Sequence, residues 1–532
     1  KGGVASQTWS IFIGTPLPPA NIVYVTEDIE TPTSWMAENV YVIDNSYDIC
    51  VKGSLTIQPG TIIKFGPGNG IATEGSGLIE AVGTSAFPIV FTSLQDDVRG
   101  GKASQDPGTA TPDIGDWAGV FLGTLRGSQF DFCEFYYGGG GTAAAMLDLG
   151  ETRDTKVTNC VIAFSEGSGL DLGGVPDVTL AGNTFYGNER PLVIHADLGL
   201  DDTNVFHNPL RPSETNTYQG IFVEPGSEAG IEFTTEVTWG ETEAAFILSD
   251  EATVLETGKL KLLPGVTVKL DRNELRVFGV LEAKGAAHQP IVFTSVNDDQ
   301  YGGKSNGTSA TSPVAGDWDS IYVALNAEAT FDHCRISYGG TKADRLDKWA
   351  ALSDGGDSAG TAISNTTFVH NLRGLDLLSP QSSITSSAFL HNEYPLRVSF
   401  DIDTDNSLSI QTNTHDAIYV GGRVSRGTNS SINWLNTQVP YVLNETAEFY
   451  RTAVYLGTGT IVRVWLGQAI RLYDGAALYN FEAATFTSYR DVARGGNVGG
   501  GYVAPANDDW VGIWDHRCYR NGTTNLFYAT HY

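Results

Sequence analysis

The strongest constraint on the fold is an internal repeat. The motif Pro-Ile-Val-Phe-Thr-Ser occurs at Pro88–Ser93 and again, 202 residues later, at Pro290–Ser295. In both copies a Pro-Gly pair and a lysine precede the motif, and Asp-Asp, Gly-Gly and Gly-Asp-Trp follow it. A third copy of the motif is visible at Ala484–Ser488, in a module that is about half as long. A repeat on this scale predicts several copies of one structural unit, arranged as an elongated array or as separate domains.

The repeat divides the chain into four parts. They are an N-terminal segment at residues 1–20, a first module at 21–215, a second at 216–425 and a shortened third at 426–532. The borders between modules fall in turn-rich stretches, Pro212–Thr217 and Gly421–Ser431.

Within a module the local pattern is one of short β-branched and aromatic runs bounded by Gly, Asn, Asp or Pro, such as Leu55–Ile57 and Ile89–Thr92. Such runs fit an antiparallel sandwich or a solenoid. Similar segments at Phe130–Phe135, Val157–Ile162 and Val178–Phe185 recur at about the length of one solenoid coil. We therefore expect an all-β chain that folds as a right-handed parallel β-helix, a β-solenoid of repeated modules.

The charge of the chain limits its partners. It has 62 acidic and 32 basic residues and a net charge of -30, which repels nucleic acid and anionic membranes and attracts cations. No apolar run reaches the roughly 18 residues of a membrane-spanning helix. We expect no nucleic-acid partner and no membrane-spanning segment.

The succession of Pro-Ile-Val-Phe-Thr-Ser, Asp-Asp, Gly-Gly and Gly-Asp-Trp resembles the pectin-lyase-like right-handed β-helix proteins of bacterial surfaces. The resemblance covers roughly residues 50–140, 255–340 and 455–515. It implies a β-helix in a secreted or cell-surface protein. It implies no single activity, because this fold carries lyases, hydrolases, adhesins and phage spikes.

Acidic residues recur in the loop after each Phe-Thr-Ser strand. Together with the neighbouring glycines they could bind Ca²⁺, which takes six to eight oxygen ligands. The alternative is that these carboxylates cap turns through backbone N–H groups. The candidate calcium ligands are Asp96, Asp97, Asp116, Asp298, Asp299, Asp317, Asp491 and Asp509.

Two kinds of catalysis are conceivable. The pairs Asp96-Asp97 and Asp298-Asp299 resemble the two carboxylates of a glycoside hydrolase, but neighbours on a strand point in opposite directions. A lyase needs a basic residue near a bound cation, and Lys64, Lys269 and Arg463 are candidates. The alternative for the lysines is a solubilising, solvent-facing position, which we favour.

The repeated tryptophans Trp117, Trp318 and Trp510 could stack on sugars, but we expect each to pack its loop onto the coil below. Cys133 and Cys334 share one position of the repeat and are expected to point into the coil. A disulfide between Cys133 and Cys160 is an alternative for the first of them.

These patterns favour a structural or adhesive surface protein over an enzyme. The alternative is a carbohydrate-active enzyme, a polysaccharide lyase or glycoside hydrolase, or a glycan-binding protein. An enzyme should carry a polar cluster in one module that the others lack. The β-prone segments Trp9–Ile13 and Asn525–Tyr532 also predict head-to-tail assembly of the chain into a filament, with a self-capping tail as the alternative.

Overall fold

The structure is a computed structural model. It describes residues 21–104, 111–141, 143–150, 152–174, 177–225, 230–307, 311–340, 350–356, 360–422, 430–498, 503–516, 518–520 and 524–531. The chain forms two compact units, Lys1–Gly169 and Leu170–Tyr532, and the border between them lies inside the first repeat module.

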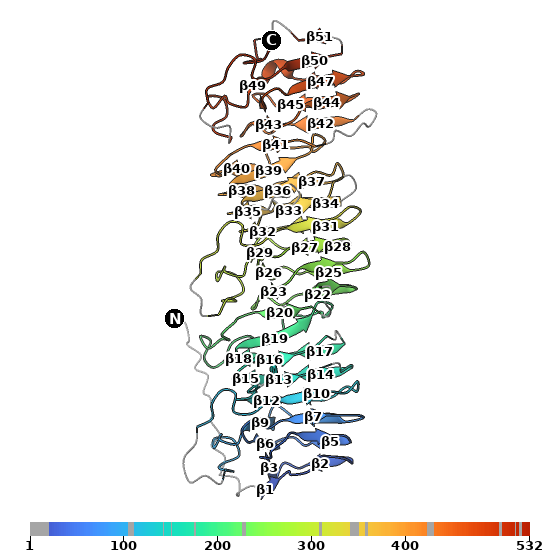
Figure 1. Cartoon of the computed structure of the whole chain (residues 1–532), viewed down its shortest axis with the longest axis vertical. Helices are drawn as coiled ribbons and strands as arrows, with labels where there is room; N and C mark the ends of the chain where they lie inside the picture. Colours follow the sequence, from blue (N-terminus) through green and yellow to red (C-terminus); the bar gives the residue numbers. More distant parts are fainter. Residues whose placement is uncertain are drawn as a thin grey trace, which may run out of the picture. The chain divides into compact units, whose positions relative to one another are not determined.

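In the first unit, three parallel sheets run side by side (Figure 1). One contains β1 (Asn21–Tyr24), β3 (Asn39–Ile43), β6 (Ile62–Phe65), β9 (Ile89–Ser93), β12 (Cys133–Tyr136) and β15 (Val161–Ala163). The second contains β4 (Ile49–Val51), β7 (Ile71–Thr73), β10 (Val120–Leu122) and β13 (Ala145–Asp148). The third contains β2 (Thr33–Trp35), β5 (Ser54–Ile57), β8 (Leu78–Val82), β11 (Gln129–Asp131) and β14 (Thr155–Thr158). Strand β16 (Ser168–Asp171) spans the border of the two units.

The second unit begins with β17 (Val178–Ala181) and β18 (Thr184–Tyr186). One of its sheets contains β19 (Arg190–His195), β20 (Ile221–Glu224), β23 (Phe246–Leu248), β26 (Thr267–Leu270), β29 (Ile291–Ser295), β32 (Cys334–Ser337), β35 (Thr367–Val369), β38 (Ala388–Leu390) and β40 (Ser409–Gln411). Another contains β21 (Ile231–Phe233), β24 (Ala252–Val254), β27 (Leu275–Val277), β30 (Ile321–Val323), β33 (Ala350–Asp354), β36 (Arg373–Leu377), β39 (Tyr394–Val398), β41 (Ile418–Val420), β43 (Tyr441–Leu443), β46 (Ile461–Val464) and β49 (Thr485–Ser488).

Three further sheets complete the second unit. The first contains β22 (Glu236–Trp239), β25 (Lys259–Leu262), β28 (Val280–Lys284), β31 (Glu328–Asp332), β34 (Gly360–Ser364) and β37 (Ser383–Thr385). The second contains β42 (Ser431–Trp434), β45 (Ala453–Leu456) and β48 (Ala477–Tyr479). The third contains β44 (Ala447–Tyr450), β47 (Ala469–Tyr473), β50 (Gly512–Asp515) and β51 (Cys518–Tyr519), and its last two strands pair antiparallel.

The pairing of the strands defines the architecture. Over most of each unit a strand pairs in parallel with the strand three positions later in the chain, as β6 does with β9 and β26 with β29. Each coil therefore contributes one strand to each of three sheets, and the coils stack as rungs. This confirms the expected fold class, an all-β parallel β-helix. The only helical segment in the described residues is the 3₁₀ turn η1 (Phe481–Ala483), and none of them forms a helix that could cross a membrane.

Stacked coils place identical side chains on top of one another. Inside the second unit, the rings of Phe368 and Phe389 are parallel with centroids 4.9 Å apart. At the turn that follows, Asn371 donates from Nδ2 to Oδ1 of Asn392, which donates to Asn413, each at 2.9 Å. Because these three coils repeat the same turn, the side-chain amide of one asparagine bonds to that of the next.

The segments predicted to drive assembly are only partly described. Trp9–Ile13 lies outside the described residues. At the other end, Leu526 and Ala529 are buried and form bridges to Phe486 and Trp510. These contacts favour the self-capping alternative there, and filament formation stays a prediction.

Candidate functional site

The carboxylates predicted to bind calcium occupy two equivalent positions in each module. The first carboxylate accepts a hydrogen bond from the threonine of the Phe-Thr-Ser strand: Thr92 to Asp96 at 2.8 Å, Thr294 to Asp298 at 2.7 Å and Thr487 to Asp491 at 2.6 Å. The second accepts from the serine that follows: Ser93 to Asp116 and Ser295 to Asp317 at 2.6 Å, and Ser488 to Asp509 at 2.5 Å. The correspondence between copies seen in the sequence is therefore also a correspondence of contacts.

These carboxylates also accept hydrogen bonds from the turns around them. Asp96 accepts from the backbone of Val98 and from the Arg99 guanidinium at 2.9 Å, and it is buried. Burial opposes ionisation of Asp96, but hydrogen bonds from Thr92 and Arg99 hold its pKa below the usual value. The arrangement is that of a turn cap.

The remaining candidates, Asp97 and Asp299, are half-buried and exposed respectively. Within the described residues no group of three or more His, Cys, Asp or Glu side chains is placed to hold a metal ion. The hydrogen bonds favour the turn-capping alternative, and calcium binding stays a prediction. Since Asp96 and Asp298 are buried and hydrogen-bonded, neither presents its carboxylate to a glycosidic bond.

The expectation that Lys64 and Lys269 face solvent is wrong. Both are fully buried, and so is Arg463 at the same position of the third copy. Each pairs on the next rung with the threonine of the Phe-Thr-Ser strand. Their side chains point away from the coil interior, but the acidic loop folds over them. They are therefore out of reach of a substrate.

The buried cations are ligated by loop oxygens. Lys64 Nζ donates to the carbonyls of Asp96 at 2.7 Å and Gly101 at 2.5 Å. Lys269 donates to the carbonyl of Gly303 at 2.5 Å and to Ser305 Oγ at 3.0 Å. The second glycine of each pair has a positive φ, 70° at Gly101 and 83° at Gly303, which turns its carbonyl toward the ammonium.

In the third copy Arg463 does the same with two nitrogens, donating to the carbonyls of Tyr489 and Gly496. Burial lowers the pKa of Lys269 to about 8, against the pull of Asp298 and Asp299. Burial also lowers the pKa of Lys64 and of Arg463. The glycine pairs thus supply carbonyl ligands, as expected, but to a side-chain cation of the chain itself.

The repeated tryptophans are part of the packing, as expected. Trp117, Trp318 and Trp510 are fully buried, and their indole nitrogens donate to the carbonyls of Tyr136, Ser337 and Phe527. None is available to stack on a sugar.

The cysteine predictions are also resolved. Cys133 and Cys334 are buried, as expected, and all five cysteines are free thiols, so the structure contains no bond between Cys133 and Cys160. Burial raises the pKa of the Cys133 thiol, and the neighbouring Cys160 adds to the shift.

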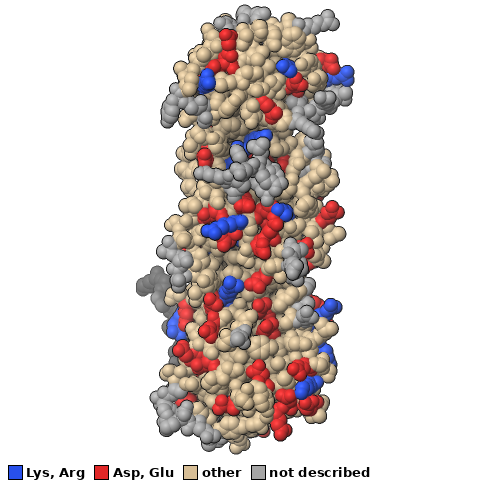
Figure 2. Space-filling model, viewed as in Figure 1, with Lys and Arg blue, Asp and Glu red and all other residues tan. Residues whose placement is uncertain are grey.

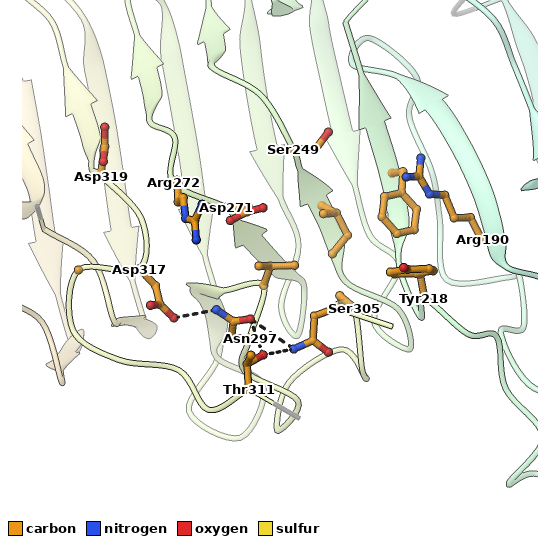
Figure 3. Close-up of a pocket in the computed structure, with 15 residues that line it drawn as sticks. Arg190, Tyr218, Ser249, Asp271, Arg272, Asn297, Ser305, Thr311, Asp317 and Asp319 are labelled. Atoms are coloured by element: carbon orange, nitrogen blue, oxygen red, sulfur yellow. Dashed lines mark hydrogen bonds between the residues drawn. The ribbon is translucent and has the colours of Figure 1, made fainter. Parts of the chain in front are cut away.

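A groove of about 660 Å³ in the second unit is the clearest candidate binding site. Its lining residues come from consecutive coils and from the loop after β29, and many are labelled in Figure 3. They are Arg190, Tyr218, Phe222, Ile247, Ser249, Asp271, Arg272, Val296, Asn297, Ser305, Asn306, Thr311, Gly316, Asp317 and Asp319.

One wall of the groove is held by a chain of hydrogen bonds, drawn as dashed lines in Figure 3. Asn297 donates to Asp317 at 3.2 Å and accepts from Thr311 at 2.7 Å, and Asn306 donates to Thr311 at 2.6 Å. Lys269 anchors the same loop through Ser305. The amides and carboxylate of this wall are therefore fixed before any ligand binds.

The other end of the groove is aromatic. Arg190 lies over the Phe222 ring, 4.8 Å from its centroid, and forms an ion pair of 3.3 Å with Glu224. Figure 3 shows Tyr218 beside Arg190 at this end, with Asp317 and Asp319 at the opposite one. Phe222 belongs to an apolar cluster with Val193, and Tyr218 packs against that cluster.

Between the two ends, Ser249 and Asp271 follow β23 and β26, whose last residues are paired on neighbouring rungs. Neither of these two side chains bonds to another group in the part of the chain that the structure describes, and both are exposed. Figure 2 shows acidic side chains, with basic ones among them, along the face drawn there. The groove itself holds three carboxylates and two guanidiniums.

Sequence reasoning identified only Asp317 among these lining residues. The others lie in five separate segments and carry no motif. One signal was present: Asn188-Glu189-Arg190 corresponds to Asn392-Glu393-Tyr394, so the copies differ in this outward-facing residue.

Comparison with known proteins adds no relative to this picture: no family model, curated protein or solved structure matches the chain.

Proposed function

We propose that this chain is a secreted or cell-surface adhesive protein that binds glycans in the groove between Arg190 and Asp319. The observation that supports the proposal is the composition of the groove: a fixed polar wall, unengaged polar groups in the middle and a tyrosine at one end. Its volume of about 660 Å³ is within the range of small-molecule sites.

The chemistry of the groove suits a ligand rich in hydroxyl groups. Asp271 and Ser249 can exchange hydrogen bonds with hydroxyls, because no side chain already occupies them in the described residues. Tyr218 offers an aromatic surface on which a sugar ring can pack. Few apolar side chains line the middle, so a hydrocarbon ligand would leave the polar groups without partners.

A binding role fits the groove better than catalysis. Outside the groove, Asp96, Asp116, Asp298, Asp491 and Asp509 accept hydrogen bonds from threonine or serine, and the repeated basic residues are fully buried. Within the groove Asp317 is held by Ser295, Asn297 and the backbone of Val314. Oδ2 of Asp317 is therefore occupied by donors of the chain itself.

The test is binding of neutral hexasaccharides based on glucose, mannose and galactose, measured on an array and then by calorimetry. We expect Tyr218→Ala and Asp271→Ala each to lower the affinity for the bound sugar about tenfold. Tyr479→Ala is the matched control, because Tyr479 is an exposed tyrosine elsewhere in the same unit, stacked on Tyr455.

The same sugars should accumulate neither new reducing ends nor unsaturated products when they are incubated with the protein. Catalytic turnover would contradict the binding role. If the unaltered chain and the Tyr218→Ala and Asp271→Ala variants bind the sugar with equal affinity, the sugar binds outside the groove.

A further inference from the structure

The repeat builds the aromatic end of the groove a second time within the same unit. Tyr218 N donates to the Glu189 carbonyl at 2.8 Å, and His415 N donates to the Glu393 carbonyl at 3.2 Å. On the adjoining strands, Val193 pairs with Phe222 and Arg397 pairs with Tyr419. We call these surfaces the first shelf (Arg190, Val193, Tyr218, Phe222) and the second shelf (Tyr394, Arg397, His415, Tyr419).

The second shelf has a polar side chain where the first has an apolar one. Where the first shelf has buried Val193, the second has Arg397, with a side chain 21% exposed. Arg397 Nη1 lies 3.9 Å from Asp376 Oδ2, and Arg373 donates to both oxygens of the same carboxylate at 3.3 Å. The buried Asp376 carboxylate thus lies next to two guanidiniums.

Two nitrogens of the second shelf have no hydrogen-bond partner among the described residues. They are Arg397 Nε and His415 Nδ1, and both are buried. Buried nitrogens that lack a partner are uncommon and call for an explanation. The Arg397 side chain is 21% exposed and lies 3.9 Å from its nearest carboxylate oxygen, so it can still take an anionic acceptor from a ligand.

Aromatic rings surround these donors. Tyr394 stacks on His415 with centroids 4.8 Å apart and meets Tyr419 edge to face at 5.5 Å. The hydroxyl of Tyr419 donates to the Val498 carbonyl at 2.9 Å, which fixes that ring. Acidic groups near the shelf are Glu393, which has the counterpart Glu189 in the first shelf, and Asp376, which has the counterpart Asp171.

We propose that the second shelf is a separate binding site for an oxyanion group, a carboxylate or a sulfate carried on a sugar, which Arg397 and Arg373 recognise. The backbone does not require an arginine at this position, since the first shelf maintains the same backbone hydrogen bonds with valine in place of Arg397. This site is independent of the groove, so neutral and acidic ligands separate the two proposals.

The test uses the whole chain with three probes: a sulfated hexasaccharide, a hexasaccharide containing glucuronate, and inorganic sulfate. We expect one of the acidic hexasaccharides to bind with an affinity that falls with rising salt, and Arg397→Val to lower that affinity at least tenfold. Binding of inorganic sulfate alone would assign the site to the anion rather than to a sugar that bears it.

Arg397→Val is expected to fold, because the first shelf has valine at this position, and His415→Tyr installs the other first-shelf residue as a second variant. Arg471→Val is the matched control, since Arg471 is half exposed in the same unit and is paired with Glu448. If Arg397→Val and His415→Tyr bind the acidic probes as the unaltered chain does, the shelf is not the site. Loss of neutral-sugar binding in Tyr218→Ala, with acidic binding retained, would support both sites.

Discussion

The two shelves show how a repeat can diverge without a change of backbone. Both are built by the same hydrogen bonds between successive coils and the same strand register. In the first shelf the central residue, Val193, is buried in an apolar cluster with Phe222 and Ile247. In the second, Arg397 and Asp376 occupy the centre. The backbone thus sets where side chains stand, and the residues of each copy decide what the position can bind.

The largest expected effect comes from placing the arginine of the second shelf at the equivalent position of the first. Val193→Arg would place a guanidinium among Phe222, Ala245 and Ile247, where it loses hydration and overpacks the cluster. We expect a loss of about 4 kcal/mol of unfolding free energy. The reverse change, Arg397→Val, should cost less than about 1 kcal/mol. Denaturant unfolding of both variants measures this asymmetry, and equal costs would show that the shelves do not differ in packing.

The next effect concerns the loop that forms the groove wall. Lys269→Met removes the donor to the Gly303 carbonyl and to Ser305 Oγ, and only Ser305 keeps another hydrogen bond, to the Gln219 carbonyl. We expect a loss of about 3 kcal/mol and weaker binding of neutral sugars, with the second shelf unaffected. Lys284→Met is the control, because Lys284 is largely exposed. A variant with native stability would mean that the loop holds itself without the cation.

The turns after β22 and β42 occupy equivalent positions but differ in how they respond to pH. Gly240 and Leu435 make equivalent backbone hydrogen bonds, to the carbonyls of Leu200 and Thr404. The next residue is the fully buried Glu241 in the first turn and the neutral Asn436 in the second. Burial raises the pKa of Glu241 to about 8, and Asp202 and Glu243 add to the shift.

Because the folded chain holds this proton more tightly than the unfolded chain, its stabilising contribution is complete below about pH 4.5. It declines as the pH rises and is lost as the pH passes about 8. Glu241→Gln, which cannot ionise, should flatten this part of the profile and be about 4 kcal/mol more stable than the unaltered chain at pH 8. Thermal unfolding at pH 5 and pH 8 checks the difference. Parallel profiles would mean that Glu241 ionises as freely as in the unfolded chain.

Calcium removal should have the smallest effect. The carboxylates Asp96, Asp298 and Asp491 already accept hydrogen bonds from threonine, and a buried cation of the chain holds each loop. We expect exhaustive chelation to change the unfolding free energy by less than about 0.5 kcal/mol. A clear drop in the melting temperature, weakened by Asp298→Ala, would establish the calcium site that the sequence predicts.

The repeat was sufficient to predict the fold and the equivalence of residues between copies. The strands expected at Leu55–Ile57 and Ile89–Thr92 lie within β5 and β9. The position of Lys64 was not predictable from alternation, which tells which face of a strand a residue takes but not what covers that face. Its covering loop arrives more than thirty residues later.

The groove was missed for a related reason. The groove brings together Arg190, Tyr218 and Asp271, which lie on stacked coils of unequal length. Their spacing in the sequence therefore does not predict that they lie close together. Positions where the copies disagree, such as Arg190 against Tyr394 and Val193 against Arg397, were the available signal. In a repeat, agreement between copies marks packing and disagreement marks candidate binding surfaces.

The buried cation under each acidic loop has a consequence for the environments in which the chain stays folded. A diffusible ion occupies its site according to its concentration, so a loop that depends on one opens on dilution. A cation attached to the neighbouring strand has a fixed effective concentration that no change of medium alters. Lys64, Lys269 and Arg463 therefore supply each of the three loops with a cation that does not depend on the ions of the medium.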